Sequence, residues 1–422
     1  MRIPCICLVA ALAACGSSEN IVTEDTPADT GGGAGASGTG GKAGTGGGSV
    51  KSDASTGGSS NTGGSTKTGG STGSGGTVGP RPPDPCIEAG TCPVGVWTDV
   101  TPNGMDVTVY GPGSVIANPS RPTDFYVGGA KAGLWKSTDY GMTYKQIATT
   151  SDVPEMPRGT VIAVAGTTPA TLWASGYSEI HKSTDDGATW TRFQLSVDLY
   201  SIVVDPYDPT HLISGLHEKD GVYESTDGGT TWNDVSGSGF PSGGISWFAF
   251  FVDTGNAATR STTWFAISQG SATAIMTSDS GANWHIPTGL NGFNHPHGNS
   301  QLFQTGQTLF VGGTGGPGDG VYRSTDLGVN WSRVDSGQKP QAVVWGSAKN
   351  VYSMYGWACG LCNIDPNIES APLPGTTWKY ATPVPGFATG SGPNTVAVTN
   401  DGSHYIFVAD MWDLGVWRYV EP

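Results

Sequence analysis

Short segments with alternating apolar and polar residues recur along most of the chain, separated by glycine-rich turns. Five of these six-residue segments are alike, namely DFYVGG (124–129), TLWASG (171–176), HLISGL (211–216), TWFAIS (263–268) and TLFVGG (308–313). A period of two between apolar positions is typical of β-strands, whose side chains point alternately to the two faces of a sheet. We find no segment with the period of an α-helix, so the sequence predicts an all-β fold.

A nine-residue segment follows each of these strands and repeats one pattern, in which Ser or Thr, Asp, Gly and an aromatic residue keep a fixed spacing. The copies are KSTDYGMTY (136–144), KSTDDGATW (182–190), ESTDGGTTW (224–232), MTSDSGANW (276–284) and RSTDLGVNW (323–331). Their aspartates, at positions 139, 185, 227, 279 and 326, are 46, 42, 52 and 47 residues apart. This period is typical of repeat architectures such as propellers, in which each repeat forms one blade.

The repeat resembles the Asp-box, or BNR repeat, of sialidases, tandem-propeller xyloglucanases and sortilin-like domains. The resemblance covers nearly all of residues 95–422. It implies that each box forms the turn between the third and fourth strands of a blade, where the Asp accepts hydrogen bonds from the turn. The box aspartates are therefore expected to be structural.

Two degenerate units complete the repeat, one around Trp378 and one at 404–420, so that 95–422 divides into seven blades of about 47 residues. The last unit lacks a fourth strand, whereas VWTDV (96–100) resembles TWNDV (231–235), the last strand of a complete unit. We therefore expect a seven-bladed β-propeller of four-stranded antiparallel blades. The N-terminal strand should complete the C-terminal blade, because this closure hides two exposed sheet edges.

In a propeller, the connections between second and third strands and those between blades lie opposite the box turns, on what we call the top face. Residues with acid–base or charged side chains fall in these connections. The catalytic candidates are His217 and His297 as bases, Tyr177 as an acid and Arg158 as a cation that neutralises a carboxylate. The substrate-binding candidates are Lys131, His295, Asn299, Trp247, Tyr355, Trp357 and Trp412.

These residues favour a carbohydrate-active enzyme that cleaves an extracellular polysaccharide. By analogy with propeller lyases, β-elimination at a uronate is slightly favoured over hydrolysis of the xyloglucanase-like or sialidase-like type. A sialidase requires three convergent arginines, and tandem-propeller xyloglucanases place their cleft between two propellers, whereas one propeller is expected here. The alternative is a non-catalytic glycan- or protein-binding propeller, in which aromatic side chains stack on the ligand.

The N-terminal end resembles a bacterial lipoprotein signal, with the apolar run ICLVAALAA leading into LAAC (12–15). This resemblance implies a signal peptide over residues 1–14 and lipidation of Cys15, and an ordinary secretory signal is the alternative. Residues 15–85 are rich in Gly, Ser and Thr and predict a disordered tether. The propeller is expected over 86–422, outside the cytoplasm and anchored by lipid at the outer membrane or cell surface.

The formal net charge of −15 argues against nucleic acid as a partner, since binding to phosphates requires Lys and Arg. The expected partners are a polysaccharide or glycan, and the membrane through the lipid alone, with the protein a monomer. Cys86, Cys92, Cys359 and Cys362 predict two local disulfides in an oxidising compartment, with half a metal site or a redox pair as alternatives for CGLC (359–362). We expect no metal or cofactor, and a structural or catalytic Ca²⁺ is the alternative.

Overall fold

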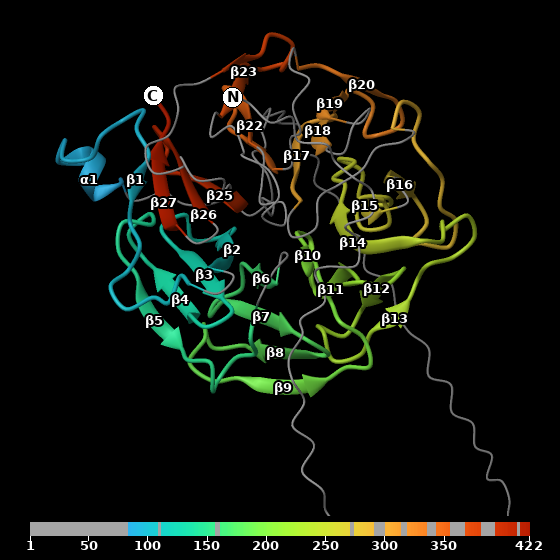
Figure 1. Cartoon of the computed structure of the whole chain (residues 1–422), viewed down its shortest axis with the longest axis horizontal. Helices are drawn as coiled ribbons and strands as arrows, with labels where there is room; N and C mark the ends of the chain where they lie inside the picture. Colours follow the sequence, from blue (N-terminus) through green and yellow to red (C-terminus); the bar gives the residue numbers. More distant parts are fainter. Residues whose placement is uncertain are drawn as a thin grey trace, which may run out of the picture. The chain divides into compact units, whose positions relative to one another are not determined.

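The computed structural model describes residues 83–108, 111–156, 161–270, 274–290, 300–313, 319–335, 343–354, 368–380, 393–411 and 414–422. These residues form seven antiparallel sheets arranged as blades around a central axis (Figure 1). In six blades the first strand lies nearest the axis and later strands lie progressively outward, whereas in the blade that joins the two chain ends the N-terminal strand is outermost. The predicted seven-bladed propeller is therefore confirmed.

The first three blades have four strands each. Blade 1 contains β2 (Pro112–Ala117), β3 (Phe125–Gly129), β4 (Gly133–Ser137) and β5 (Lys145–Ala148). Blade 2 contains β6 (Ile162–Ala165), β7 (Thr171–Gly176), β8 (Glu179–Ser183) and β9 (Thr191–Gln194). Blade 3 contains β10 (Val203–Asp205), β11 (Asp208–Gly215), β12 (Val222–Ser225) and β13 (Asn233–Asp234).

The remaining blades complete the ring. Blade 4 contains β14 (Gly244–Phe251), β15 (Trp264–Gly270) and β16 (Ala274–Thr277). Blade 5 contains β17 (Leu302–Thr305), β18 (Thr308–Gly313), β19 (Gly320–Ser324) and β20 (Trp331–Arg333). Blade 6 contains β21 (Val343–Gly346), β22 (Asn350–Met354), β23 (Glu369–Pro372) and β24 (Lys379–Tyr380). Blade 7 contains β25 (Pro393–Asn400), β26 (Tyr405–Met411), β27 (Gly415–Val420) and, from the other end of the chain, β1 (Thr98–Asp99).

Strand β1 closes the ring as the sequence predicts. It pairs antiparallel with β27, so that Thr98 lies opposite Arg418 and Asp99 opposite Trp417. The backbone N–H of Val100 extends this pairing by donating to the carbonyl oxygen of Val416 at 2.9 Å. The outer edge of β27 is thus covered by a segment more than 300 residues away in sequence.

Two details differ from the prediction. Blade 4 has three strands in the described residues, and its fourth is reduced to one bridge between Met276 and His285. Pro287 follows two residues later and has no N–H to continue the pairing. A four-residue helix, α1 (Pro85–Glu88), precedes the propeller and was not predicted, because four residues show no helical period. Asp84 caps it by accepting from the N–H groups of Cys86 and Ile87.

The box turn around Asp185 shows why its sequence repeats. Ser183 Oγ donates to Asp185 Oδ1 at 2.7 Å and accepts from the N–H of Gly187 at 2.8 Å. The same carboxylate accepts from the backbone N–H of Thr189 at 2.8 Å and from its Oγ1 at 2.6 Å. Asp186 and Gly187 adopt φ values of 63° and 88°, which favours Gly at the second position.

The other four box aspartates accept the same two bonds from the residue four positions later, Thr143, Thr231, Asn283 or Asn330. Each box connects the third and fourth strands of its blade or, in blade 4, the third strand and the bridge. The carboxylates therefore act as hydrogen-bond acceptors within the turns, and the predicted position and bonding of the box are confirmed.

The hydrophobic core lies between neighbouring blades. Ile213 and Val222 of blade 3, for example, pack with Trp247, Trp264 and other residues of blade 4. Comparable clusters occur at the other junctions, so each blade buries its two faces against its neighbours. Among the described residues, no helix is long and apolar enough to cross a membrane.

Candidate functional site

A small concavity on the top face lies where blades 2 and 3 meet. It is lined by Val161, Gly176, Tyr177, Asp198, Leu199, Tyr200 and His217. Its free volume is about 10 Å³, roughly enough for one water molecule. A larger ligand would therefore lie across the concavity and place only one or two groups inside it.

Tyr177 stands at the rim of this concavity, at the tip of the hairpin between β7 and β8. Gly176 pairs with Glu179, so Tyr177 and Ser178 form a two-residue turn, and Ser178 has a φ of 54°. The Tyr177 side chain is 52% exposed and is the one aromatic among the exposed large apolar residues of the described ranges. This turn presents an aromatic ring to solvent on the predicted functional face.

His217, in the connection between β11 and β12, is fixed against the segment that enters blade 3. Its Nδ1 lies 2.9 Å from Asp198 Oδ2, and its backbone N–H donates to the carbonyl oxygen of Asp198 at 3.0 Å. The imidazole stacks on Tyr200, with ring centroids 4.6 Å apart. Since a carboxylate can only accept, Nδ1 carries the proton and Nε2 is the basic nitrogen in the neutral imidazole.

A second acidic group, Glu218, lies near this imidazole. Glu218 Oε1 lies 3.9 Å from His217 Nε2, and the Glu218 side chain is 64% exposed. No Lys or Arg is among the described residues that line the concavity. The local charge therefore suits a neutral or hydroxyl-rich ligand better than an anionic one.

Asp198 and Tyr200 were not among the predicted site residues. Their position just before the first strand of a blade places them in a between-blade connection, which is the signal that identifies them. The repeat gives no indication that Asp198 would contact His217, because the two belong to different turns of the blade. The contact depends on how blade 3 packs against the end of blade 2.

The structure brings together two of the four catalytic candidates, Tyr177 and His217, in one concavity. Lys131 is exposed in the connection between β3 and β4 of blade 1, near Asp106, and does not line it. The other predicted positions, His297, Arg158, His295, Asn299, Tyr355, Trp357 and Trp412, lie outside the described residues.

The structure corrects the predicted position of Trp247. The sequence places it in a top-face connection as a stacking platform, but it lies within β14 and its side chain is fully buried. Its ring packs on Phe240 at 4.7 Å, and Nε1 donates to Asp220 Oδ1 at 3.1 Å. The strand begins earlier than its sequence suggests, which turns Trp247 from a surface residue into part of the junction between blades 3 and 4.

The central channel is the larger cavity, with a volume of about 290 Å³. Its wall comes mainly from aliphatic residues of the first strands, such as Val115, Ala163, Leu302 and Val396. Gln301, which also lines it, uses its amide to pair with the backbone N–H and carbonyl of Val396. The titratable residues of the described wall are Asp205, which contacts His211, and Tyr207, which donates to Asp253.

Asp410 is a buried titratable group that contacts Thr395, one of the channel-lining residues. Its Oδ1 accepts from the N–H and Oγ1 of Thr395, both at 2.7 Å. Complete burial raises the pKa of Asp410 to about 7. Since the side chain has no exposed surface, it contacts no ligand in this conformation.

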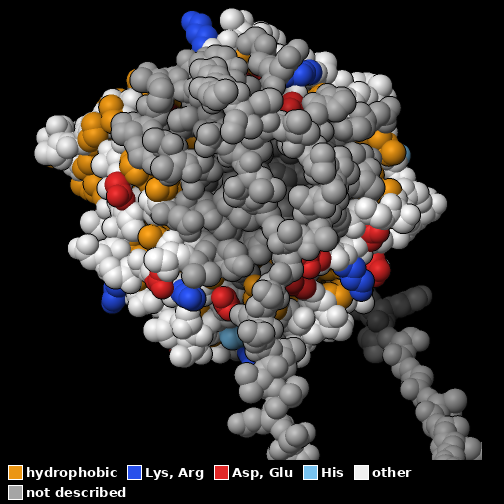
Figure 2. Space-filling view, viewed as in Figure 1, with side chains coloured by type: hydrophobic (Ala, Val, Ile, Leu, Met, Phe, Trp, Pro, Cys, Tyr) orange, Lys and Arg blue, Asp and Glu red, His pale blue; other side chains and the backbone are white. Residues whose placement is uncertain are grey.

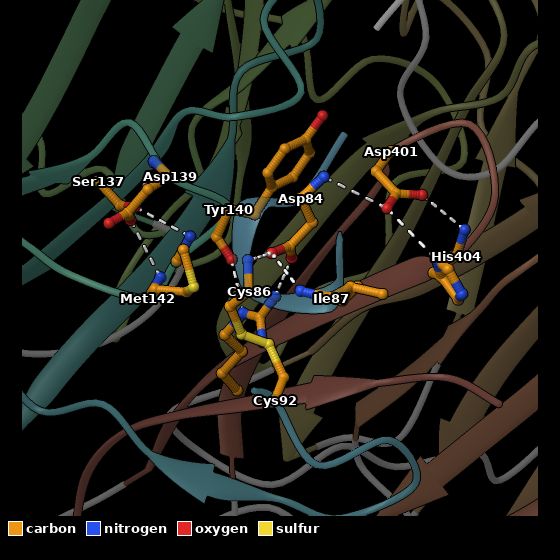
Figure 3. Close-up of polar contacts among 12 residues, drawn as sticks. Asp84, Cys86, Ile87, Cys92, Ser137, Asp139, Tyr140, Met142, Asp401 and His404 are labelled. Atoms are coloured by element: carbon orange, nitrogen blue, oxygen red, sulfur yellow. Dashed lines mark hydrogen bonds and ion pairs between the residues drawn. A yellow bond between two sulfur atoms is a disulfide. The ribbon is translucent and has the colours of Figure 1, made fainter. Parts of the chain in front are cut away.

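Possible metal ligands gather at one place in the described residues, where Asp84, Cys86 and Cys92 lie close together (Figure 3). Cys86 and Cys92 form a disulfide, which confirms that half of the cysteine prediction, and Arg418 pairs with Asp84. Oxidised sulfurs and a paired carboxylate are poor metal ligands. Cys15, Cys359 and Cys362 lie outside the described residues.

Acidic and basic side chains are interspersed around the rim of the face seen in Figure 2. Together, seven radial sheets and the repeated turn define an Asp-box β-propeller with a small aromatic and acidic concavity on one face. The chain belongs to the DUF6242 β-propeller family, whose domain matches residues 96–419. A search of curated protein sequences finds no match.

Solved structures share the fold at low sequence identity. A GH74 xyloglucanase from Xanthomonas campestris is 16% identical with a TM-score of 0.54, and the alignment covers 76% of this chain and 53% of that one. A GH74 enzyme from Niastella koreensis is 17% identical with a TM-score of 0.56 and the same two coverages. YCF48 bound to D1 peptide is 14% identical with a TM-score of 0.53, covering 78% of this chain and 99% of that one. The chain thus spans about half of these two GH74 enzymes and nearly all of YCF48.

Proposed function

We propose that this protein is an exported propeller that binds an extracellular polysaccharide on its top face, at the junction of blades 2 and 3. The exposed ring of Tyr177, at the rim of a concavity that contains Asp198 and His217, carries this proposal. An exposed aromatic face beside hydrogen-bonding groups suits a sugar ring, whose C–H groups stack while its hydroxyls find polar partners.

The size and charge of the concavity support binding over cleavage. With room for about one water molecule, it leaves a sugar ring in contact with solvent, whereas enzymes gain from excluding water around the reacting atoms. Asp198 and Glu218 favour hydroxyl groups over carboxylates. The alignment of this chain with nearly the whole of YCF48, whose structure contains a bound peptide, supports a single propeller that acts as a binding module.

Export and anchoring are part of the proposal. The N-terminal sequence has the pattern of a lipoprotein signal ending at Cys15, and the disulfide between Cys86 and Cys92 fits an oxidising compartment. A lipidated Cys15 and the Gly-rich segment after it would hold the propeller away from the membrane surface.

Cleavage of the polysaccharide is a second candidate, favoured by the bond between Asp198 and His217. In β-elimination, His217 Nε2 would take the C5 proton of a uronate, the C4–O4 bond would break as C4 and C5 become doubly bonded, and Tyr177 would donate a proton to O4. Arg158 would neutralise the carboxylate. Hydrolysis of the GH74 type is less well supported, since the chain spans about half of those enzymes.

Affinity electrophoresis on a panel of neutral and anionic polysaccharides tests the proposal. We expect one or more polysaccharides to retard the protein, Tyr177→Ala to weaken retardation about tenfold and Tyr177→Phe to preserve it, because the ring supplies the contact. Val329→Ala, at an exposed residue within the fifth box, is the matched control. Retardation that is unchanged in Tyr177→Ala would contradict the proposed site.

The same panel separates binding from cleavage. Absorbance near 235 nm, roughly where unsaturated uronates absorb, would rise only for a lyase, and new reducing ends without that absorbance would indicate a hydrolase. If either product forms, His217→Ala should reduce turnover by about 10²–10⁴. Binding without any product supports the primary proposal.

A further inference from the structure

The segment 83–92 lies against the seam where the last blade meets the first. Arg418, in β27, is the centre of this contact and is only 5% exposed. Its Nη2 pairs with Asp84, its Nε donates to the carbonyl oxygen of Tyr140 at 2.8 Å, and its Nη1 lies 3.6 Å from Cys92 Sγ. One guanidinium thus connects blade 7, the box turn of blade 1 and the N-terminal segment.

Asp84 is fully buried, and its two carboxylate oxygens make different contacts. Its Oδ2 pairs with Arg418, while Oδ1 accepts from the N–H of Cys86 at 3.0 Å and caps α1. The Asp84 N–H also lies 3.5 Å from Asp401 Oδ2, in the turn between β25 and β26 (Figure 3). A buried charge pair of this kind is costly to break, because either partner would be left uncompensated.

The disulfide fixes the loop that carries Asp84. It joins Cys86, in α1, to Cys92, with Cα atoms 5.3 Å apart. The N–H groups of Thr91 and Cys92 both donate to the carbonyl oxygen of Cys86, at 2.9 and 3.3 Å. Without the covalent bond, few apolar contacts would keep this small ring closed, since no residue of α1 is buried.

One apolar contact of the segment crosses the same seam. Ile87 packs against Tyr140 of the first box and against Ile406 and Val420 of blade 7. One turn of chain contains Asp84, Cys86 and Ile87. The ion pair, the disulfide and the apolar contact that these residues make therefore depend on one another. Just downstream, Gly95 donates its N–H to the carbonyl oxygen of Val420 at 2.8 Å, before β1 begins.

We propose that residues 83–92 form a redox-dependent latch that locks the closure of the propeller ring. In the oxidised protein, the disulfide holds Asp84 on Arg418 and so keeps β1 on β27. Reduction by a dithiol breaks the Cys86–Cys92 bond, gives two cysteine thiols and converts the dithiol to its cyclic disulfide. The loop is then no longer held closed by a covalent bond. The ion pair between Asp84 and Arg418 breaks more often, and β1 separates from β27 more readily.

Hydrogen exchange measured by mass spectrometry tests the latch in the full chain carrying Cys359→Ser and Cys362→Ser, so that Cys86 and Cys92 are the cysteines that remain after Cys15. With dithiothreitol, amides in 93–100 and 414–422 should exchange about tenfold faster or more. Amides of β11, in blade 3, are the internal reference and should not change. Equal exchange with and without dithiothreitol would overturn the proposal.

Two variants assign the effect to its parts. Cys86→Ser with Cys92→Ser should exchange rapidly at the same two segments and show no response to dithiothreitol. Asp84→Asn, with the disulfide intact, should accelerate the same segments, because Arg418 loses its countercharge. If Asp84→Asn exchanges as slowly as the parent protein, the link from disulfide to Arg418 is wrong.

Discussion

At the scale of single residues, two kinds of polar group look similar in the sequence but do different work. The box aspartates accept hydrogen bonds from their own turns, and these bonds hold the pKa of Asp185 down at about 2, with the contact to Thr189 the main cause. Asp198, by contrast, bonds a histidine from another turn, in a concavity on the opposite face. The two carboxylates therefore differ in what they bind, since Asp185 is bound within its own turn and Asp198 contacts a side chain of the candidate site.

Asp227→Ala tests the first role. Removing the carboxylate leaves the N–H groups of Thr230 and Thr231 without their acceptor, which should lower the free energy of unfolding by about 1–3 kcal/mol. Urea denaturation measures this loss, and polysaccharide retardation of the folded protein should be unchanged. A variant of full stability that no longer binds would show that the box belongs to the site.

The residue scale also shows where the sequence is a poor guide. Tyr177 and His217 were predicted from their place in the repeat, since a polar or aromatic residue in a short top-face turn has few packing roles. The same reasoning wrongly predicted a top-face position for Trp247, because its strand begins earlier than the alternating pattern shows. Burial of an aromatic ring near a strand end depends on the neighbouring blade, which the local sequence does not describe.

At the scale of elements, the connection that leaves one blade for the next can form hydrogen bonds with the box of that next blade, and we call such a connection a link. Ser238, between β13 and β14, exchanges backbone hydrogen bonds with Ala282 and Trp284 of the fourth box, at 3.0 and 2.7 Å. Gly239 follows with a φ of 79°, and a Cβ there would overlap the carbonyl oxygen of Trp284. Thr288 and Gly289 repeat this arrangement at the fifth box, so a glycine is required at both of these links.

Gly239→Ala should therefore be strongly destabilising, by about 3 kcal/mol or more, because it combines a strained backbone with a steric overlap. Gly255→Ala is the matched control, since Gly255 has a similar φ of 70° with nothing within 4 Å of the added Cβ. It should cost about 1 kcal/mol. Equal losses for the two variants in thermal unfolding would show that the overlap is relieved without cost.

Blade 3 contains a histidine held between carboxylates on the two neighbouring strands. His211 on β11 is 8% exposed, with Nδ1 3.0 Å from Asp205 Oδ2 and Nε2 2.9 Å from Glu224 Oε1. Burial alone would lower the pKa of His211, but the two carboxylates raise it to about 9. The folded state therefore binds this proton more tightly than the unfolded state does.

The contribution of His211 to stability should be complete below pH 6.5, its unfolded pKa, and should fall as the pH rises through about 9. We expect the unfolding free energy to decrease by on the order of 2–3 kcal/mol from this group across that interval. Urea denaturation of the parent and His211→Gln at pH 6 and 9.5 (about half a unit outside the interval at each end) measures the difference. A parallel pH dependence in both proteins would contradict the assignment.

At the scale of the whole molecule, the ring is closed by joining the two ends of the domain. The count of blades and the partner of β1 followed from the sequence, because a fixed period and a missing last strand leave one arrangement without open edges. The latch at 83–92 did not follow, since its ion pair joins residues 334 positions apart and lies outside the repeat. The pairing of Asp198 with His217 joins residues only 19 positions apart, but the repeat does not indicate it because the two residues belong to different turns.

Two deletions test the closure. Removing residues 86–102 takes away β1, exposes the edge of β27 and should lower the melting temperature by several degrees, because strand pairing and packing worth several kcal/mol are lost. Removing residues 20–78 should leave the melting temperature unchanged, since Gly-rich sequence of this kind adds no core. Equal melting of the two truncated proteins would contradict the closure.

The central claim is that the top face at the junction of blades 2 and 3 binds the ligand while the box face is structural. A crystal structure of the protein with an oligosaccharide of the polysaccharide that retards it most would test this directly. The claim predicts a sugar ring over Tyr177, with a hydroxyl within hydrogen-bonding distance of Asp198 or His217. A saccharide bound at the box turns or inside the central channel, with the Tyr177 concavity empty, would contradict it.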